Sequence, residues 1–102
     1  NYVIAAVCHG PAGLVSATTV EGKPLVAGRK MTGFTNEEEE IAGLNKMVPF
    51  ALETKLRELG ADFVSTEPWG NYVVVDGNLI TGQNPQSSGS FSKAILEVLA
   101  NC

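Results

Sequence analysis

The fold of this chain is decided by the stretch VIAAVCHGPA at residues 3–12. Its first half, Val3–Val7, is a continuous apolar run without polar alternation, which is typical of a parallel strand covered on both faces. The run ends at Cys8, and Pro11 suits the first turn of a helix, where its missing N–H costs nothing. The stretch therefore predicts a buried strand with neighbours on both sides, a tight turn and a short helix over residues 12–17.

Further short strands are expected outward from this unit. Asp76-Gly77-Asn78 is a hairpin signal, because Asp-Gly pairs adopt the backbone angles of a tight two-residue turn. The strands expected are residues 25–27, 30–34, 63–64, 72–76 and 78–81.

Helices are expected between these strands. One begins after an N-cap at Thr35 or Asn36, since the helix dipole favours the acids Glu37–Glu40 in its first turn. Another runs from Pro49 and is closed by Gly60. The apolar positions at helical spacing are Leu52, Leu56 and Leu59 in that helix, and Phe91, Ala94, Ile95, Val98 and Leu99 in a final helix. Strands alternating with helices predict the α/β class.

Composition narrows the function classes. The 102 residues are 44% hydrophobic and 18% charged, which fits one small domain with a core. Seven basic against eleven acidic residues give a net charge of −4, so nucleic acid is a poor candidate partner. No apolar run approaches the roughly 20 residues of a spanning helix, so a membrane partner is not expected either.

The two cysteines do not make a secreted disulfide framework. The sequence contains no signal peptide and no glycosylation motif, so we expect a cytoplasmic protein. Cys102, at the end of the final helix, is expected to be a core or interface residue rather than a second catalytic thiol.

Cys8 lies in the turn between the expected strand and the expected short helix, a position suited to a catalytic thiol. Backbone N–H groups at the start of a helix would lower its pKa and could hold an oxyanion, although a buried structural thiol is the alternative. His9 is the single histidine, and it can meet Cys8 only if the turn bends sharply. A carboxylate on the far ring nitrogen would keep His9 basic; Glu37–Glu40 offers candidates, or is simply a solvated helix start.

Several blocks of the sequence together resemble the ThiJ/PfpI superfamily, and most closely its class I glutamine-amidotransferase-like, glyoxalase III-type branch. They read AVCHGPA at residues 6–12, GKPL at 22–25, TGFTNEEE at 32–39 and VDGNLITGQNP at 75–85. These blocks stand in the family's order and extend over nearly all of the chain.

The resemblance implies a flavodoxin-like α/β sandwich with a mostly parallel sheet and a nucleophile elbow. It assigns Cys8 as nucleophile, His9 as base and Glu39 as the orienting acid, with Glu38 or Glu40 as alternatives to Glu39. Phe34 and Trp69 are pocket walls or core residues, and the role of Gln83-Asn84-Pro85 is left as structural.

The activity implied by the resemblance is glutathione-independent conversion of methylglyoxal, a small 2-oxoaldehyde, to D-lactate, with no metal or cofactor. The family also includes redox-sensitive stress chaperones that need no catalysis, and cysteine amidohydrolases or peptidases. No phosphate-binding glycine loop, paired CxxC or HExxH motif points to a cofactor or metal.

Family domains are about twice this length, so residues 1–102 resemble the C-terminal part of one domain. We therefore expect a partial chain, with a missing N-terminal segment completing the sheet, or a homodimer. The missing part would carry the first strands and an acid that hydrogen-bonds the cysteine.

Overall fold

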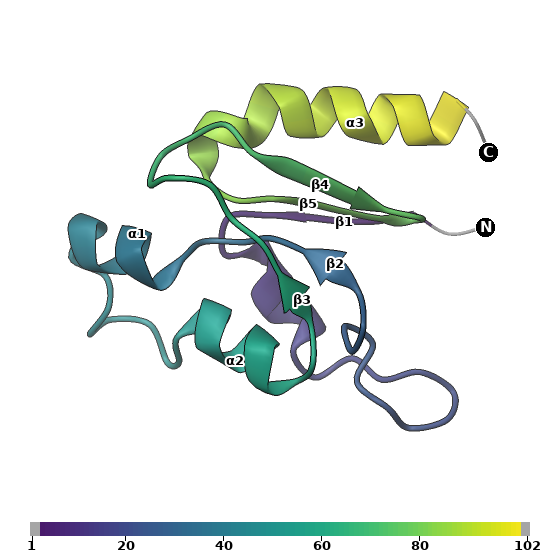
Figure 1. Cartoon of the computed structure of the whole chain (residues 1–102), viewed down its shortest axis with the longest axis horizontal. Coiled ribbons are helices and arrows are strands. Elements are labelled where there is room, and N and C mark those ends of the chain that lie inside the picture. The colour runs from purple at the N-terminus through teal and green to yellow at the C-terminus, as the bar shows by residue number, and fades with distance from the viewer. Residues whose placement is uncertain (1–2, 101–102) are drawn as a thin grey trace.

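The computed structural model describes residues 3–100, in which strands alternate with helices (Figure 1). In chain order, with η for a 3-10 helix, the elements are β1 (Ile4–Val7), η1 (Gly10–Leu14), β2 (Lys30–Met31), α1 (Asn36–Ala42), α2 (Leu52–Glu58), β3 (Asp62–Phe63), β4 (Val73–Asp76), β5 (Leu79–Gly82), η2 (Pro85–Ser87) and α3 (Ser88–Ala100). The predicted α/β class is confirmed. The expectation for Cys102 lies outside the described residues.

Two sheets form the centre of the molecule. The larger has the order β1-β5-β4, with β1 parallel to β5, while β4 and β5 make the predicted antiparallel hairpin around Gly77. The smaller sheet pairs β2 and β3 in parallel. Within residues 3–100, β1 pairs with β5 alone, so the second neighbour expected beside β1 does not lie in the described part of the chain.

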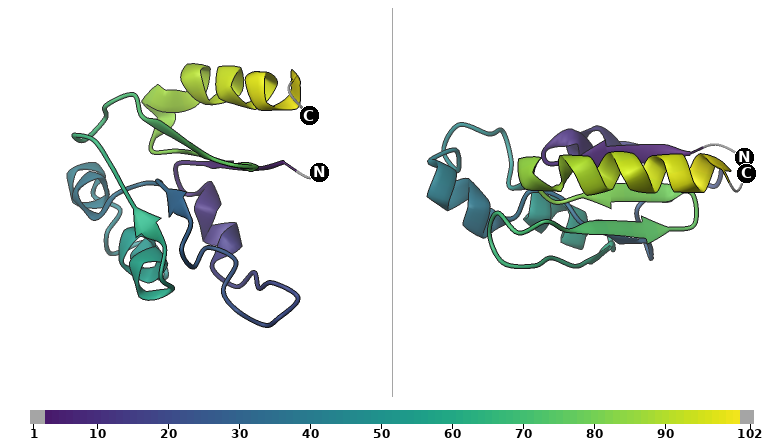
Figure 2. Two further views of the ribbon diagram at one scale, coloured as in Figure 1. Left: turned by 45° about the vertical axis from the view of Figure 1, so that its right-hand side comes forward. Right: turned by 90° about the horizontal axis from the view of Figure 1, so that it is seen from above.

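Helices cover both faces of the larger sheet (Figures 1 and 2). α3 packs over one face, and η1 and α2 lie on the other side. The main core cluster is on the α2 side and consists of Val26, Met31, Leu52, Leu56, Phe63 and Leu79. No residue of α3 is fully buried, and Leu99 is 51% exposed, so the predicted apolar face of α3 is only partly covered.

The helix boundaries follow from local capping. Thr35 is the N-cap of α1: its Oγ1 accepts from the Glu38 N–H at 3.1 Å, and the Glu38 carboxylate accepts from the Thr35 N–H at 3.0 Å. This reciprocal pair is a capping box. Gly60 follows α2 with a φ of +93°, a left-handed conformation that glycine adopts without strain. The predicted start of α1 and the predicted end of α2 are confirmed, whereas α2 begins at Leu52 rather than at Pro49.

Three local predictions are wrong. Residues 12–17 do not form the expected helix, since η1 ends at Leu14. Residues 25–27 form turns, because Val26 enters the core while its carbonyl accepts from the Arg29 N–H. Of residues 30–34 only the first two form a strand; beyond them the Thr32 N–H donates to Thr81 Oγ1 and leaves the ladder.

Candidate active site

Cys8 forms a strained turn directly after β1. Its φ is +62°, which costs a non-glycine residue about 1–2 kcal/mol. The backbone there is held on two sides, since the Cys8 N–H donates to Gly82 O at 2.9 Å and Cys8 O accepts from the Phe34 N–H at 2.9 Å. A strained turn between a strand and a helix is the geometry of a nucleophile elbow.

The sharp turn brings His9 beside the thiol. His9 Nδ1 lies 3.6 Å from Cys8 Sγ, and His9 Nε2 lies 2.9 Å from Glu39 Oε1. When Nε2 carries the proton and donates it to the carboxylate, Nδ1 is unprotonated and can accept the thiol proton. The structure therefore brings the three predicted site residues together, with His9 between Cys8 and Glu39.

The acidic run Glu37–Glu40 divides between solvent and interior. Glu37 and Glu40 are exposed, whereas Glu38 and Glu39 are buried, so the expectation of a fully solvated run is wrong for the two middle residues. They are buried because α1 turns this side toward His9 and the residues around Trp69. Glu39 meets His9, while Glu38 accepts from the Trp69 N–H at 2.8 Å.

The electrostatics of the thiol differ from the sequence expectation. Burial raises the pKa of Cys8 above the ordinary cysteine value, and the negative charges of Glu38 and Glu39 add to this rise. The His9 backbone N–H lowers the pKa but does not outweigh burial. The prediction of a lowered thiol pKa is therefore wrong for the described chain, and His9 is the group placed to remove the proton.

The His9 ring packs against Phe34, which in turn packs against Trp69. The ring of Phe34 lies 4.3 Å from the His9 ring, and the Trp69 ring meets Phe34 edge-on at 5.5 Å. Phe34 is buried, while Trp69 is half-buried and has a φ of +64°. Phe34 thus belongs to the interior, and Trp69 forms its boundary with solvent.

Two polar residues whose role the sequence left as structural, Gln83 and Asn84, hold the segment around Trp69. Gln83 and Asn84 are buried; Gln83 Oε1 accepts from the Thr66 N–H at 2.9 Å, and Asn84 Nδ2 donates to Glu38 Oε2 at 2.8 Å and to Gly70 O at 2.7 Å. Both follow β5, the strand parallel to β1 in the sheet. Their position at the carboxyl end of a strand next to the nucleophile's strand is the signal that could have connected them to the site.

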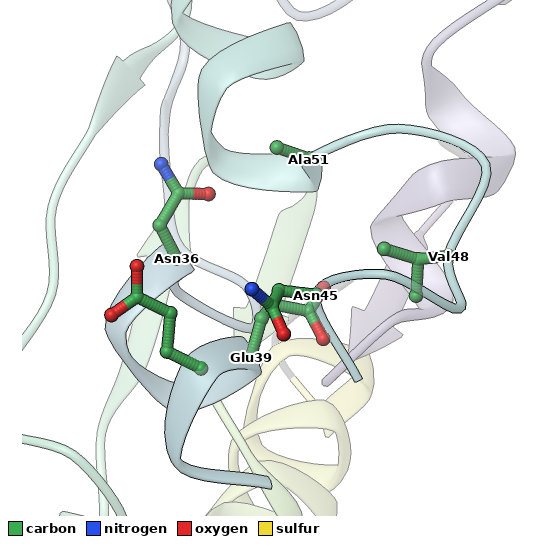
Figure 3. A pocket seen from close by; sticks show the side chains of 6 residues that line it. Asn36, Glu39, Asn45, Val48 and Ala51 are labelled. Carbon is green, nitrogen blue, oxygen red and sulfur yellow. The ribbon is translucent and has the colours of Figure 1, made fainter. Parts of the chain in front are cut away.

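A pocket of about 210 Å³ lies beside α1 (Figure 3). Its lining consists of Asn36, Glu39, Glu40, Asn45, Val48 and Ala51. Cys8 and His9 do not contribute to it, so it reaches the site only through Glu39. This pocket is therefore not where a substrate would meet the thiol.

Among residues 3–100, no group of three or more His, Cys, Asp and Glu side chains is arranged to hold a metal ion. Within the same range, no helix combines the length and apolar character needed to cross a membrane.

Comparison with known proteins gives consistent matches along the chain. A family model described as "DJ-1/PfpI family" matches residues 1–98. Glutathione-independent glyoxalase HSP31 of Saccharomyces cerevisiae is 37% identical over 107 residues, covering 97% of this chain and 44% of the yeast protein.

Solved structures give the same result for the fold. The crystal structure of glyoxalase III from Candida albicans is similar with a TM-score of 0.86 at 34% identity, covering 94% of this chain and 43% of that one. The X-ray structure of Francisella tularensis Rapid Encystment Protein 24 KDa has a TM-score of 0.92 at 45% identity, covering 95% and 43%. The expected flavodoxin-like fold is confirmed, and the chain spans less than half the length of these proteins.

Proposed function

The chain belongs to the DJ-1/PfpI family, and on that premise we propose that it is the catalytic part of a glutathione-independent glyoxalase that converts methylglyoxal to D-lactate. The observation that carries the proposal is the line from Cys8 Sγ through His9 to Glu39, with separations of 3.6 and 2.9 Å. The similarity to the yeast glutathione-independent glyoxalase HSP31 supports an activity of this class.

The reaction begins at the thiol. His9 Nδ1 accepts the proton of Cys8, and the thiolate sulfur bonds to the aldehyde carbon of methylglyoxal, giving a hemithioacetal once its oxygen is protonated. Because the pKa of the Cys8 thiol is raised, this proton transfer requires the neighbouring imidazole.

His9 then moves one proton along the substrate. It removes the hydrogen of the former aldehyde carbon, giving an enediolate, and returns a proton to the adjacent carbon, giving a lactoyl thioester on Cys8. Water attacks the thioester carbonyl, the carbon–sulfur bond breaks, and lactate and the free thiol result. Hydrogen and oxygen balance with one water per methylglyoxal, so no metal or redox cofactor enters this scheme.

Glu39 orients the base during these steps. Its side chain is 3% exposed, and its hydrogen bond to Nε2 fixes the ring and stabilises the imidazolium that forms each time His9 holds an extra proton. Glu38 and Glu40 do not take this role, since Glu38 accepts hydrogen bonds from Thr35 and Trp69 and Glu40 is exposed.

We extend the proposal to the assembly and its place in the cell. The relatives are longer than this chain, and β1 pairs on one side only within residues 3–100. We infer that residues 1–102 are the C-terminal part of a single domain, that an N-terminal segment or a second copy flanks β1, and that the protein acts in the cytoplasm without a nucleic acid or membrane partner.

The test is formation of D-lactate from methylglyoxal without glutathione, measured with a D-lactate-specific dehydrogenase. We expect Cys8→Ser to abolish it, because a serine hydroxyl is a far weaker nucleophile at neutral pH. Cys102→Ser is the matched control and is expected to keep the rate. Wild-type rates in Cys8→Ser would refute the proposal.

A holding chaperone is the second candidate function. Exposed apolar side chains on and after α1 favour it, since Ile41 is 58% and Met47 77% exposed. If this function is independent of catalysis, Cys8→Ala should suppress aggregation of a heated client as well as the wild type does. Loss of suppression in Cys8→Ala would contradict it.

A further inference from the structure

Glu38 is a buried carboxylate that the proposed mechanism does not use. It is 0% exposed, and each of its oxygens accepts two hydrogen bonds. Oε1 accepts from Thr35 N–H at 3.0 Å and Thr35 Oγ1 at 3.1 Å; Oε2 accepts from Trp69 N–H at 2.8 Å and Asn84 Nδ2 at 2.8 Å.

These donors keep Glu38 ionised. Burial by itself raises the pKa of the Glu38 carboxyl, but the hydrogen bonds, with that from Asn84 foremost, outweigh it and lower the pKa below the ordinary value. Burying a charge is costly unless it is fully hydrogen-bonded. A capping box needs only one acceptor oxygen, so the cap alone does not account for the second oxygen.

The second oxygen fixes the residues around Trp69. The Trp69 backbone has a φ of +64°, a conformation that persists only where its surroundings hold it. Asn84 adds a hydrogen bond to Gly70 O at 2.7 Å, and Gln83 holds the Thr66 N–H at 2.9 Å. The segment of residues 66–70 is therefore tied to α1 and to the end of β5.

Packing continues from this segment to the base. The Trp69 ring meets Phe34 at 5.5 Å, and Phe34 meets the His9 ring at 4.3 Å. Phe34 is 2% exposed, so a shift of the Trp69 ring is passed to a close-packed neighbour rather than to solvent. His9 is thus held at Nε2 by Glu39 and on its face by Phe34.

We propose that Glu38 is a positioning residue for the reaction: its carboxylate fixes the Trp69 segment and, through Phe34, the orientation of the His9 ring. Glu38 and Glu39 are adjacent in α1. Glu38 then fixes the packing against the face of the His9 ring, and Glu39 binds the ring nitrogen Nε2. This inference deepens the proposed function and rests on it for its kinetic readout.

The main test compares Glu38→Gln with Glu37→Gln in the natural protein. The glutamine amide would set an NH2 group against two of the four donors, so the Trp69 segment loosens; a misplacement near 1 Å can cost about 100-fold, and we expect a fall in kcat/KM of about 10- to 100-fold. Glu37 is exposed on the same helix and its variant should keep the wild-type rate. Wild-type kcat/KM in Glu38→Gln overturns the proposal.

A second readout separates positioning from general support of the fold. The charge of Glu38 raises the pKa of the Cys8 thiol, so Glu38→Gln should move the midpoint of Cys8 alkylation by iodoacetamide to lower pH. Asn84→Ala keeps that charge but loosens the Trp69 segment; its kcat/KM should fall while the alkylation midpoint stays. Asn84→Ala also serves if Glu38→Gln does not fold, and full activity in it overturns the proposal.

A double-mutant cycle tests the route through Trp69. If Glu38 acts through this ring, Glu38→Gln should cost little more once Trp69→Ala is present, so the two losses combine to much less than their product. Fully multiplicative losses overturn the proposal. Absence of D-lactate in the wild-type protein would refute the glyoxalase function, whereas unchanged kcat/KM in Glu38→Gln of an active protein would refute the positioning role alone. The alkylation arm needs no turnover and shows whether Glu38 carries its charge beside Cys8.

Discussion

Glu39→Gln is the substitution that isolates the contribution of one hydrogen bond to the reaction. It keeps the size of the side chain and removes the charge that faces His9 Nε2 at 2.9 Å. A hydrogen bond to a charged group is worth about 1.5–3 kcal/mol, and each 1.36 kcal/mol is about tenfold in rate. We therefore expect kcat to fall by about 10- to 150-fold if the bond acts fully in the transition state.

The same substitution should make the thiol more reactive. The negative charge of Glu39 raises the pKa of Cys8, so its removal lowers that pKa and increases the thiolate fraction near neutral pH. Alkylation of Cys8 by iodoacetamide at a fixed neutral pH should therefore become faster while turnover of methylglyoxal becomes slower. Partial unfolding of the site would also expose Cys8 and speed its alkylation, so the result requires a parallel measurement that the fold is kept.

Stability should change little in Glu39→Gln. Glu39 Oε2 is buried and has no hydrogen-bond partner among the described residues, so replacing the carboxylate by an amide also removes a desolvation cost. Thermal unfolding provides this check, and Glu40→Gln, an exposed neighbour on α1, is the control. A wild-type kcat, or slower alkylation than in the wild type, would refute the reasoning about Glu39.

Three further outcomes follow from the geometry. Because the pKa of the Cys8 thiol is raised in the folded chain, the unfolded state loses its proton first, and stability to urea should fall as pH rises above the ordinary cysteine pKa, an effect absent in Cys8→Ser. Gly82→Ala should destabilise the fold by about 1–3 kcal/mol, since an added Cβ would lie 2.8 Å from Val7 Cγ2. Gly89→Ala in α3 is the control: its added Cβ meets nothing within 4 Å, so it should be neutral or stabilising. Thermal unfolding of both variants measures the difference. Thr35→Ala should cost about 1 kcal/mol through loss of the cap, measured by urea unfolding, and an unchanged midpoint would contradict the cap's role.

The sequence was most informative where local chemistry decides the structure. The Thr35 cap and the closing Gly60 set their helices without help from distant residues. The Gly77 hairpin is equally local. The pairing of His9 with Cys8 was also predictable, because the two are adjacent in the chain and only the bend between them was in question.

The failures occur where tertiary contacts replace local preference. Val26 is a β-branched residue typical of strands, yet it lies in a turn and its side chain packs in the core. Glu38 lies in an acidic helix start of the kind that is usually solvated. In the structure it is buried and accepts hydrogen bonds from Trp69 and Asn84, which are distant in sequence. The raised pKa of Cys8 arises from burial and from charges folded against it, which no inspection of its sequence neighbours reveals.

The left-handed backbone at Cys8 has a consequence for anyone improving this protein. Glycine at position 8 would relieve a backbone penalty of about 1–2 kcal/mol, and the φ of +62° suits it. A library sorted only for heat resistance would thus reward loss of the sulfur. Directed evolution of this scaffold must therefore measure turnover in every round, because thermal stability favours glycine at position 8 whereas catalysis requires cysteine there.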